Sequence, residues 1–426
     1  MNGFAIFFRA QSYSTDRLRD AWHRFVLSQS LTFEVAGRLV LLGDHTSVVK
    51  DGGRMPGVVS LRETSETQSK PAYFRGQCWG AIGLLVGELS QCFCLPLNLQ
   101  LHQGFQHLRI AEDAADKPGM SERIVQMALE FAYTHNRPVW LVLDAFFSTR
   151  SVFRLAVSTL SIETRQPLVQ IVTRAKKNYV AYWPANAKPT GKRGARRRYG
   201  NKLVLSEVFK HRYLFQATEV EVYGKTETVL LLARPLLWRP LGWKHPLQFV
   251  WAITSHGPIV LMCSELDVPP ATVLRLYCSR TRIETLFATL KQRLGVFQFH
   301  FWSLYLPKHS RRPFSNRLLK MPASENLDQV KTCWQAMERF VLCGCIATGL
   351  LQWFSLKYHS ALWDKKILYL RTRSRELPSE NTVRQILAPW LTRQFSPTSK
   401  KAQWWKIYEV VNGDYSDDEW FQQQAA

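Results

Sequence analysis

VPPATVLRLYCSRTRIETLFATLKQRLG, the stretch from Val268 to Gly295, has the strongest local pattern in this sequence. Pro269 and Pro270 suit the first turn of a helix, and Gly295 suits the position just past a helix end. No helix breaker lies between them. Apolar residues recur at steps of three, four or seven, at Leu276, Ile283, Phe287, Leu290 and Leu294. The pattern predicts a single helix with one buried stripe.

Four polar side chains share one edge of this predicted helix. At about 100° per residue, Tyr277, Arg280, Glu284 and Lys291 fall within an arc of roughly 60° beside the apolar stripe. A solvated face would scatter charges of both signs, whereas here one carboxylate lies among cations at the border of the core. One interpretation is a salt bridge between Arg280 and Glu284, four residues apart. The other is a metal ligand next to phosphate-binding groups.

The spacing of these four residues resembles a known signature. Tyr, two residues, Arg, three residues, Glu, six residues and Lys is the pattern of bacterial insertion-sequence transposases with an Asp-Asp-Glu (DDE) active site. The likeness continues through Leu294-Gly295 to Trp302. The resemblance implies two upstream aspartates at strand ends, in an α/β catalytic domain of the ribonuclease-H-like type.

Two aspartates meet that expectation. Asp44 closes the strand-like run Gly37–Gly43, and Asp144 ends the continuous apolar run Pro138–Leu143, which suits a buried strand. Taken singly, an Asp at a strand end is more often a turn or capping residue. Their neighbourhoods, Asp44-His-Thr and Leu143-Asp-Ala-Phe-Phe, also resemble the family's motifs.

The order of the predicted elements supports the same fold. Gly37–Gly43 is followed by two more strand-like runs, Tyr73–Val86 and Cys92–Leu101, which suggests an antiparallel meander. A helix over Ser121–Asn136, with Ser121 as its cap, precedes the strand that ends at Asp144. A helix over residues 149–160 and a buried strand over Pro167–Thr173 follow. This order is that of a ribonuclease-H-like domain.

The resemblance implies what these residues do. Asp44, Asp144 and Glu284 would be the catalytic residues and the ligands of two Mg²⁺ or Mn²⁺ ions, with Asp44 bridging both. Arg280 and Lys291 would hold DNA phosphates, and Tyr277 would donate a hydrogen bond to another. Intervals of 100 and 140 residues between the three acids suit family members with a β-rich insertion before the glutamate.

That insertion would span residues 176–264, and it contains a basic loop. Between Lys188 and Lys202 the cations lie among Gly and Pro without apolar periodicity, and the DNA-binding candidates are Lys192, Arg193, Arg196, Arg197 and Arg198. A flexible solvated loop is the plainer interpretation. Alternating stretches follow at Thr218–Leu232 and Phe249–Thr254, with a hairpin across Ser255–Pro258.

One tryptophan departs from the family's arrangement. Some members carry a tryptophan that stacks on a flipped base, in the strand that leads into the glutamate helix. Here that strand begins Ile259-Val-Leu, so the candidate for base stacking is Trp251 on the preceding strand. A core tryptophan is the competing interpretation.

Composition indicates a folded globular protein with a large excess of positive charge. The 426 residues are 46% hydrophobic and 21% charged, with a formal charge of +23 and a pI of about 9.9, which indicates a polyanionic partner or else a very soluble basic protein. No secretory signal is evident, and the longest apolar run, Phe340–Phe354, is too short to span a bilayer. Eight cysteines without a C-x-x-C pair suit free thiols. The expected location is the bacterial cytoplasm, associated with the nucleoid.

Five segments are expected from these patterns. They are a short helical segment at 1–36, which a truncated DNA-binding region would explain, the first part of the catalytic domain at 37–175, the insertion at 176–264, the second part at 265–306 and a helical region at 307–426, with helices at Glu325–Lys357 and Ser379–Gln394.

The sequence therefore predicts a transposase that cleaves the ends of an insertion sequence and joins them to target DNA. Its partner would be double-stranded DNA, both element ends and target, and both ends must be held together by at least a homodimer. Two alternatives stay open. One is a truncated, catalytically inactive DNA-binding relative, and the other is a nuclease of the same fold that cuts without strand transfer.

Overall fold

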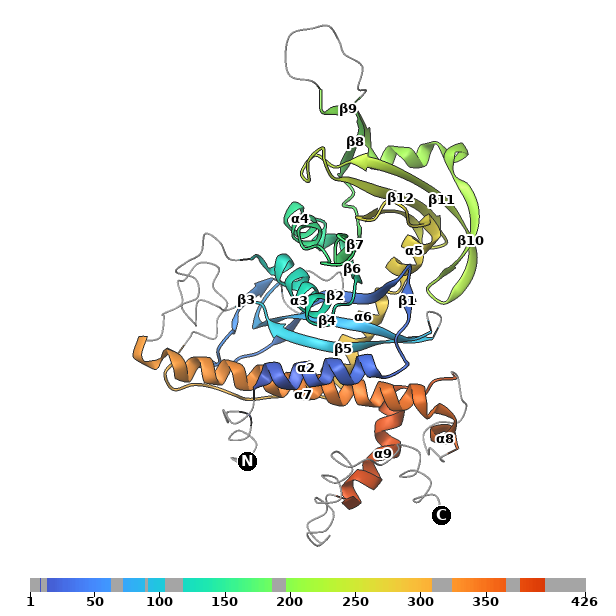
Figure 1. Ribbon diagram of the computed structural model, residues 1–426. Helices are drawn as coiled ribbons and strands as arrows, with labels where there is room; N and C mark the ends of the chain where they lie inside the picture. Colours follow the sequence, from blue (N-terminus) through green and yellow to red (C-terminus); the bar gives the residue numbers. More distant parts are fainter. Residues whose placement is uncertain are drawn as a thin grey trace. The chain divides into compact units, whose positions relative to one another are not determined.

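The computed structural model describes residues 14–62, 72–88, 91–103, 118–185, 197–308, 324–364 and 376–394, together with Phe8. The chain divides into two compact units, Met1–Leu350 and Leu351–Ala426. The first unit is an α/β structure around one mixed sheet of thirteen strands (Figure 1).

Five strands form the centre of this sheet, in the spatial order β5, β4, β2, β6, β7. Their bounds are β2 (Arg38–Val49), β4 (Tyr73–Gly87), β5 (Cys92–Leu101), β6 (Val139–Leu143) and β7 (Val169–Arg174). The first three pair antiparallel, as the meander prediction required, while β6 is parallel to β2 and β7 is parallel to β6. Short strands β1 (Glu34–Val35) and β3 (Val59–Arg62) pair with β2 and β4.

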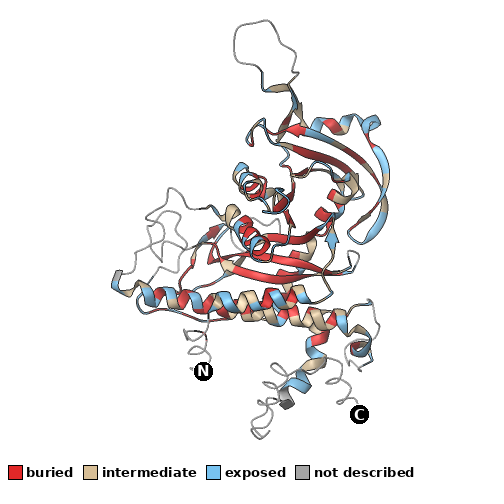
Figure 2. Ribbon diagram, viewed as in Figure 1, coloured by how far each residue is buried: buried red, intermediate tan, exposed pale blue. Residues whose placement is uncertain are grey.

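The central strands are buried because helices cover them, as Figure 2 shows. Every residue of β6 is fully buried, which explains its uninterrupted apolar sequence. The helices α3 (Met120–Thr134) and α4 (Arg150–Ser158) follow the predicted ranges closely, but α3 is capped by Gly119 and not by Ser121. The reason is that the Glu122 carboxylate accepts the Gly119 N–H (2.8 Å), which fixes the helix start one residue earlier.

The two faces of β2 meet different helices. At Gly43 a side chain would lie 2.6 Å from Ile124 of α3, so glycine allows this helix to approach the strand closely. The next side chain, Asp44, points to the opposite face and bonds to Arg280. The predicted end of the strand at Asp44 is wrong, because β2 continues to Val49 through backbone pairing with β4.

The stretch Val268–Gly295 is not one helix, as its periodicity predicted. It forms α5 (Pro270–Cys278), α6 (Thr281–Ala288) and a π-helical turn, η6 (Thr289–Arg293). At the junction the Ser279 hydroxyl donates to the Leu276 carbonyl (2.6 Å) and the Thr281 hydroxyl to the Cys278 carbonyl (3.3 Å). Short hydroxyl side chains compete in this way with the backbone hydrogen bonds of the helix. At the junction the backbone forms 3₁₀-type bonds between residues three apart, such as the Arg280 N–H to the Tyr277 carbonyl (3.1 Å).

The predicted insertion is rich in strands, but these strands extend the central sheet. They are β8 (Val180–Pro184), β9 (Tyr199–Val204), β10 (Gln216–Val222), β11 (Lys225–Leu237), β12 (Pro246–Thr254) and β13 (Gly257–Cys263). β13 pairs directly with β7, and β12, β11, β8 and β9 follow in spatial order. Short 3₁₀ turns lie at Ala145–Phe147, Leu205–Lys210, Arg212–Leu214 and Ser324–Asn326.

The alternating stretch Thr218–Leu232 contains a turn that its pattern did not reveal. Tyr223 and Gly224 both have positive φ, 51° and 83°, and they join β10 to β11 as a tight hairpin in which Val222 pairs with Lys225. The predicted hairpin across Ser255–Pro258, which joins β12 to β13, is confirmed. The tip at Tyr223 is important for the site described below.

Helix α7 (Leu327–Lys357) begins close to its predicted start and ends at its predicted end. Among the described residues it is the one helix long and apolar enough to cross a membrane, with a mean hydropathy of 1.4 and 39% of its most apolar window buried. Its first half lies beside α2 (Thr15–Ser28), where Arg339 bonds to Thr15 (2.9 Å; Figure 1). There it also packs on the sheet, where the Glu338 carboxylate accepts the Leu101 N–H (3.1 Å).

The second unit is helical in its described part. It contains the end of α7, α8 (His359–Trp363) and α9 (Glu380–Gln394), which confirms the predicted helix near Ser379–Gln394. Gln352 donates to Glu380 (3.0 Å), so α7 and α9 are tied within the unit. All eight cysteines of the chain are free thiols, and all except Cys343 are buried.

Glu338 makes the stability of the first unit depend on pH. Burial raises the pKa of this carboxyl from 4.5 to about 7, despite the N–H of Leu101. Its stabilising contribution is therefore full below pH 4.5 and is lost as the pH rises through about 7. Glu338→Gln keeps the accepting oxygen and cannot ionise, so we expect it to raise the free energy of unfolding at pH 8 by up to about 3 kcal/mol. Urea denaturation at pH 4.5 and pH 8 measures this, and an equal effect at both pH values would contradict it.

Candidate active site

Asp44 lies on the central strand of the sheet. Its carboxylate accepts the N–H of His45 (2.7 Å) and pairs with the Arg280 guanidinium (3.3 Å). Burial is the main reason why the pKa of Asp44 rises from 3.8 to about 6, since the two donors lower it and the carboxylates of Asp144 and Glu284 raise it further. The three acids predicted from the sequence therefore act on one another electrostatically.

Asp144 follows β6 directly, as predicted. The parallel pairing of β2 with β6 runs from Leu39 with Val139 to Leu42 with Val142, two residues before Asp44 and Asp144, and the Asp144 charge raises the pKa of Asp44. The backbone carbonyl of Asp144 accepts hydrogen bonds from the Thr173 hydroxyl (2.8 Å) and from the Phe147 N–H (3.0 Å). These bonds fix the backbone and leave the carboxylate available.

Glu284 approaches from α6, which packs on β2 and β5 through its buried face. Its side chain is 55% exposed, and its carboxylate pairs with Arg280 (2.5 Å). Arg280 lies at the junction of α5 and α6, is 16% exposed, and bonds to both Glu284 and Asp44. Burial lowers the pKa of Arg280, but Glu284, Asp144 and Asp44 outweigh this and raise it. The plain salt bridge expected from sequence thus exists, and it extends to a second acid.

Tyr277 and Lys291 lie on the same side of β2 as Arg280. Tyr277 is buried, and burial raises its pKa to about 12, with Arg280 and Asp144 acting on it in opposite directions. Lys291 lies in the π-helical turn and donates to the Ser47 carbonyl of β2 (3.0 Å). Arg280 and Lys291 therefore both bond to β2, and Glu284 is linked to it through Arg280, although the four residues do not share one continuous helix.

Two further residues belong to the site but were not predicted as part of it. Tyr223 lies at the tip of the β10–β11 hairpin. Burial is the main cause of its raised pKa, while Arg280 lowers that pKa and Glu284 raises it. Arg174, at the end of β7, lowers the pKa of both Tyr223 and Tyr277. The dipeptide Tyr223-Gly224 is a turn signal inside a strand-like stretch, and it is the sequence feature that could have revealed this hairpin.

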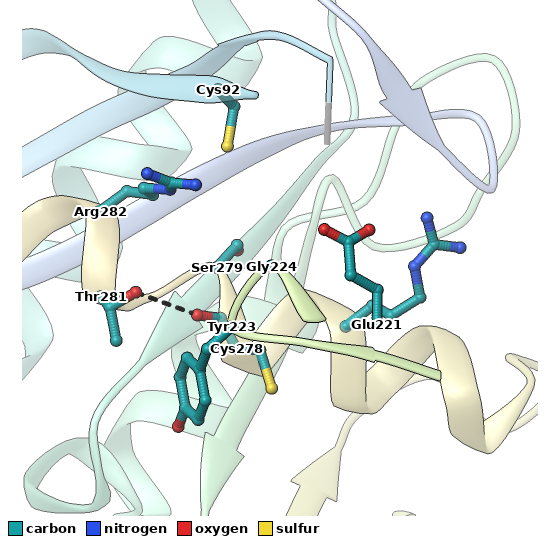
Figure 3. A pocket seen from close by; sticks show the side chains of 9 residues that line it. Cys92, Glu221, Tyr223, Gly224, Cys278, Ser279, Thr281 and Arg282 are labelled. Atoms are coloured by element: carbon teal, nitrogen blue, oxygen red, sulfur yellow. Dashed lines mark hydrogen bonds between the residues drawn. The ribbon is translucent and has the colours of Figure 1, made fainter. Parts of the chain in front are cut away.

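The hairpin tip and the helix junction enclose a pocket of about 150 Å³ (Figure 3). Figure 3 shows Tyr223 beside Cys278 and Ser279, and the Cys278 thiol bonds to the Tyr223 backbone. Arg282 and Cys92 line the opposite wall. The pocket therefore lies between the β10–β11 hairpin and the α5–α6 junction, and Thr281 and Arg282 of α6, the helix that carries Glu284, line it.

Phe146 provides an exposed aromatic ring next to Asp144. It is 55% exposed and contacts the His45 ring edge-on, at 6.2 Å between centroids. Phe147 stacks on His45 at 5.3 Å between centroids and is fully buried. Of the two phenylalanines after Asp144, one is therefore buried and the other keeps much of its ring exposed.

Trp251 is not available for base stacking, contrary to the sequence-based assignment. Its side chain is 0% exposed, and its indole N–H donates to the Leu205 carbonyl (2.8 Å). The competing interpretation, a core tryptophan, is the one that the structure bears out. Of the basic-loop candidates, Arg197 and Arg198 are exposed, and Arg198 lies over the Trp243 ring at 5.7 Å. Lys192, Arg193 and Arg196 lie outside the described residues.

The carboxylates of Asp44, Asp144 and Glu284 are oxygen donors that suit a hard divalent cation, but Arg280 now pairs with two of them. In the described part of the chain, no group of three or more Asp, Glu, His or Cys side chains is close enough to hold a metal ion. The guanidinium lies between Asp44 and Glu284 instead. One guanidinium does not balance three carboxylates. Burial is the main cause of the raised pKa of Asp44, and the charges of Asp144 and Glu284 add to it. Oxygen ligands with excess negative charge are those that Mg²⁺ and Mn²⁺ prefer.

Neither a protein-family model nor a curated protein matches the chain. Among solved structures, the crystal structure of the NurA nuclease from Sulfolobus solfataricus aligns with 70% of this chain and 97% of that chain, at 9% sequence identity and a TM-score of 0.23. A similarity this low carries no argument about fold or function.

Proposed function

We propose that this protein is a DNA-cleaving enzyme of the DDE type, acting as a transposase that cuts the ends of an insertion sequence and joins them to target DNA. One observation carries the proposal. Asp44 lies on β2, Asp144 directly follows the parallel neighbouring strand β6, and Arg280 pairs with both Asp44 and Glu284. Acids separated by 100 and 140 residues in the sequence can come close only through the tertiary fold.

The sheet supports a ribonuclease-H-like catalytic domain. Three antiparallel strands are followed by a helix, a parallel strand that ends at Asp144, a second helix and another parallel strand. This is the element order that the family resemblance implies. The sheet then continues into the strands of the insertion, so the proposed domain and its insertion share one set of backbone hydrogen bonds.

Asp44, Asp144 and Glu284 would hold the divalent ions. Bound there, Mg²⁺ or Mn²⁺ supplies activation of water or of a 3′ hydroxyl and stabilises the leaving oxygen. The chain's own groups bind and orient the DNA. Arg280, once released from the acids, offers a forked donor to a backbone phosphate, and Lys291 offers a second cation further along β2. Tyr277 is buried at the end of α5, and Arg280 and Arg174 both act to lower its pKa.

We assign the base-stacking role to Phe146, because Trp251 is buried. An exposed ring beside Asp144 can stack on a base next to the reacting phosphate, and such stacking is worth about 1–3 kcal/mol per base. The net charge of +23 supports a double-stranded DNA partner, and joining two element ends requires at least a homodimer. A bacterial cytoplasmic location belongs to the same proposal.

The test is DNA cleavage by the full chain in the presence of Mg²⁺. A supercoiled plasmid carrying the element's inverted repeats should be nicked at the repeat ends, and strand-transfer products should follow. Nicks without transfer products would favour the nuclease alternative. Binding without nicks, in Mg²⁺ and in Mn²⁺, would favour the inactive DNA-binding alternative and overturn the proposal.

Arg280 competes with a bound cation for the carboxylates. Arg280→Gln removes a positive charge from Asp44 and Glu284, so we expect it to tighten Mn²⁺ binding at pH 8 about tenfold while it weakens DNA cleavage. Titration calorimetry with MnCl₂ measures the affinity without DNA. Arg275→Gln, an exposed arginine on α5, is the matched control. Unchanged or weaker Mn²⁺ binding by Arg280→Gln would contradict a cation site at these acids.

A further inference from the structure

A large cavity lies beyond Asp44, at the end of β2. Its volume is about 710 Å³, and its lining includes Lys50, Lys291, His300, Asp51 and Gln298. Two lysines against one acid give the lining a net positive charge. Lys291 joins this cavity to the site described above, because its ammonium group donates to the Ser47 carbonyl only three residues from Asp44.

The cavity and Asp44 lie on the same face of the sheet. Side chains alternate along a strand, so residues 44 and 50, six apart, point to the same side. The strand geometry extends to Lys50, whose N–H donates to the Arg75 carbonyl of β4 (3.1 Å). At about 3.3 Å per residue, Ser47 is roughly 10 Å and Lys50 roughly 20 Å from Asp44 along the strand.

Lys50 is a buried cation without a neutralising acid. It is 9% exposed, and no ion pair of Lys50 occurs within the described ranges. Its ammonium group donates to the carbonyls of Phe297 (2.5 Å) and Phe299 (2.8 Å) and lies 4.1 Å from the centre of the Phe299 ring. These groups solvate the charge but do not cancel it, and burial lowers the pKa of Lys50 to about 8. An anion in the cavity would supply the missing countercharge.

We propose that the Lys50 cavity binds backbone phosphates of the DNA strand whose scissile phosphate lies at Asp44, about three to six nucleotides away from that phosphate. The distance along β2, roughly 10–20 Å, spans that number of nucleotides at about 3.4 Å per nucleotide of one strand in a duplex. This inference rests on the proposed function for the identity of the scissile phosphate. It assigns a direction to the bound strand, along β2 from Asp44 toward Lys50.

The test measures the affinity and salt dependence of the full chain for a labelled 20-base-pair duplex without metal. Lys50→Gln should weaken binding about tenfold at fixed salt, and should reduce the slope of log affinity against log salt by roughly 0.9, the value for one lost phosphate contact. Gln298→Glu places an acid on an exposed wall of the same cavity and should weaken binding without disturbing the buried ammonium. Arg154→Gln, an exposed cation on α4, is the control and should leave the affinity nearly unchanged.

A purely structural role for Lys50 would lower thermal stability without changing the salt slope, and that result, with Gln298→Glu binding like the parent, would overturn the inference. Cleavage assays on the same proteins keep the two proposals apart. A parent protein that cleaves DNA, with both cavity variants binding normally, would refute the cavity alone. A parent that never cleaves, with the predicted loss of affinity in both variants, would refute the chemistry and retain the cavity as a DNA-binding site.

Discussion

Asp144→Asn is expected to lower the rate of Mg²⁺-dependent DNA cleavage by about a thousandfold or more, with DNA affinity changed by no more than a few-fold. The substitution keeps the size of the side chain and leaves the two hydrogen bonds to the Asp144 carbonyl in place, since both involve the backbone. It removes one negative charge from the three proposed oxygen ligands, which should weaken the binding of a divalent cation and the chemistry that depends on it. Initial nicking rates on supercoiled plasmid measure the effect.

The matched control is Asp267→Asn, the same chemical change at an exposed acid just before α5. It should cleave like the parent. If Asp144→Asn also cleaved like the parent, the assignment of Asp44, Asp144 and Glu284 as metal ligands would be wrong. If it lost cleavage together with most of its thermal stability, Asp144→Glu and a circular dichroism spectrum would show whether the fold or the chemistry had been lost.

Trp251→Ala is expected to lower stability, whereas Phe146→Ala is expected to weaken DNA binding and to change stability little. Trp251 is fully buried and hydrogen-bonded to Leu205, so its truncation should cost about 3–5 kcal/mol in the free energy of unfolding. Phe146 is 55% exposed, so its truncation should cost little stability. If its ring stacks on a base, Phe146→Ala should weaken binding to DNA that has an unpaired base at the cleavage site by about 1–3 kcal/mol.

Urea denaturation and fluorescence anisotropy measure the two quantities on the same preparations. Phe146→Tyr and Trp251→Phe are the conservative partners, and Phe146→Tyr should restore DNA binding. Normal binding by Phe146→Ala would remove the stacking role. A destabilised Trp251→Ala with selectively weaker binding to unpaired bases would reopen a base-contacting role for Trp251.

The elements around Asp144 could be predicted because local sequence determined them. A short, continuous run of five apolar residues is typical of a buried strand in an α/β sheet, and β6 has this structure. Asp144 follows the end of this strand, as predicted. Asp44 was harder. His45, Thr46 and Ser47 look like the start of a loop, but β4 supplies a partner for each of them, so the strand continues. Pairing across thirty residues is not visible in the alternation of one strand.

The glutamate helix shows a second limit. Its periodicity was real, and Ile283, Phe287 and Leu290 are buried as predicted. Periodicity reports which side chains face the core and does not report whether the backbone ladder is continuous, which here depends on the Ser279 and Thr281 hydroxyls. Tyr223 reaches the site from a hairpin more than fifty residues before Arg280, and only the three-dimensional pairing of β10 with β11 brings it there.

The length of β2 between Asp44 and Lys50 has a consequence for related sequences. An insertion or deletion of one residue in this interval would turn the lysine to the α3 side of the sheet, and a change of two would restore its side but move it by about 7 Å. Homologues that share the chemistry should therefore keep the spacing of six residues from Asp44 to Lys50 without gaps.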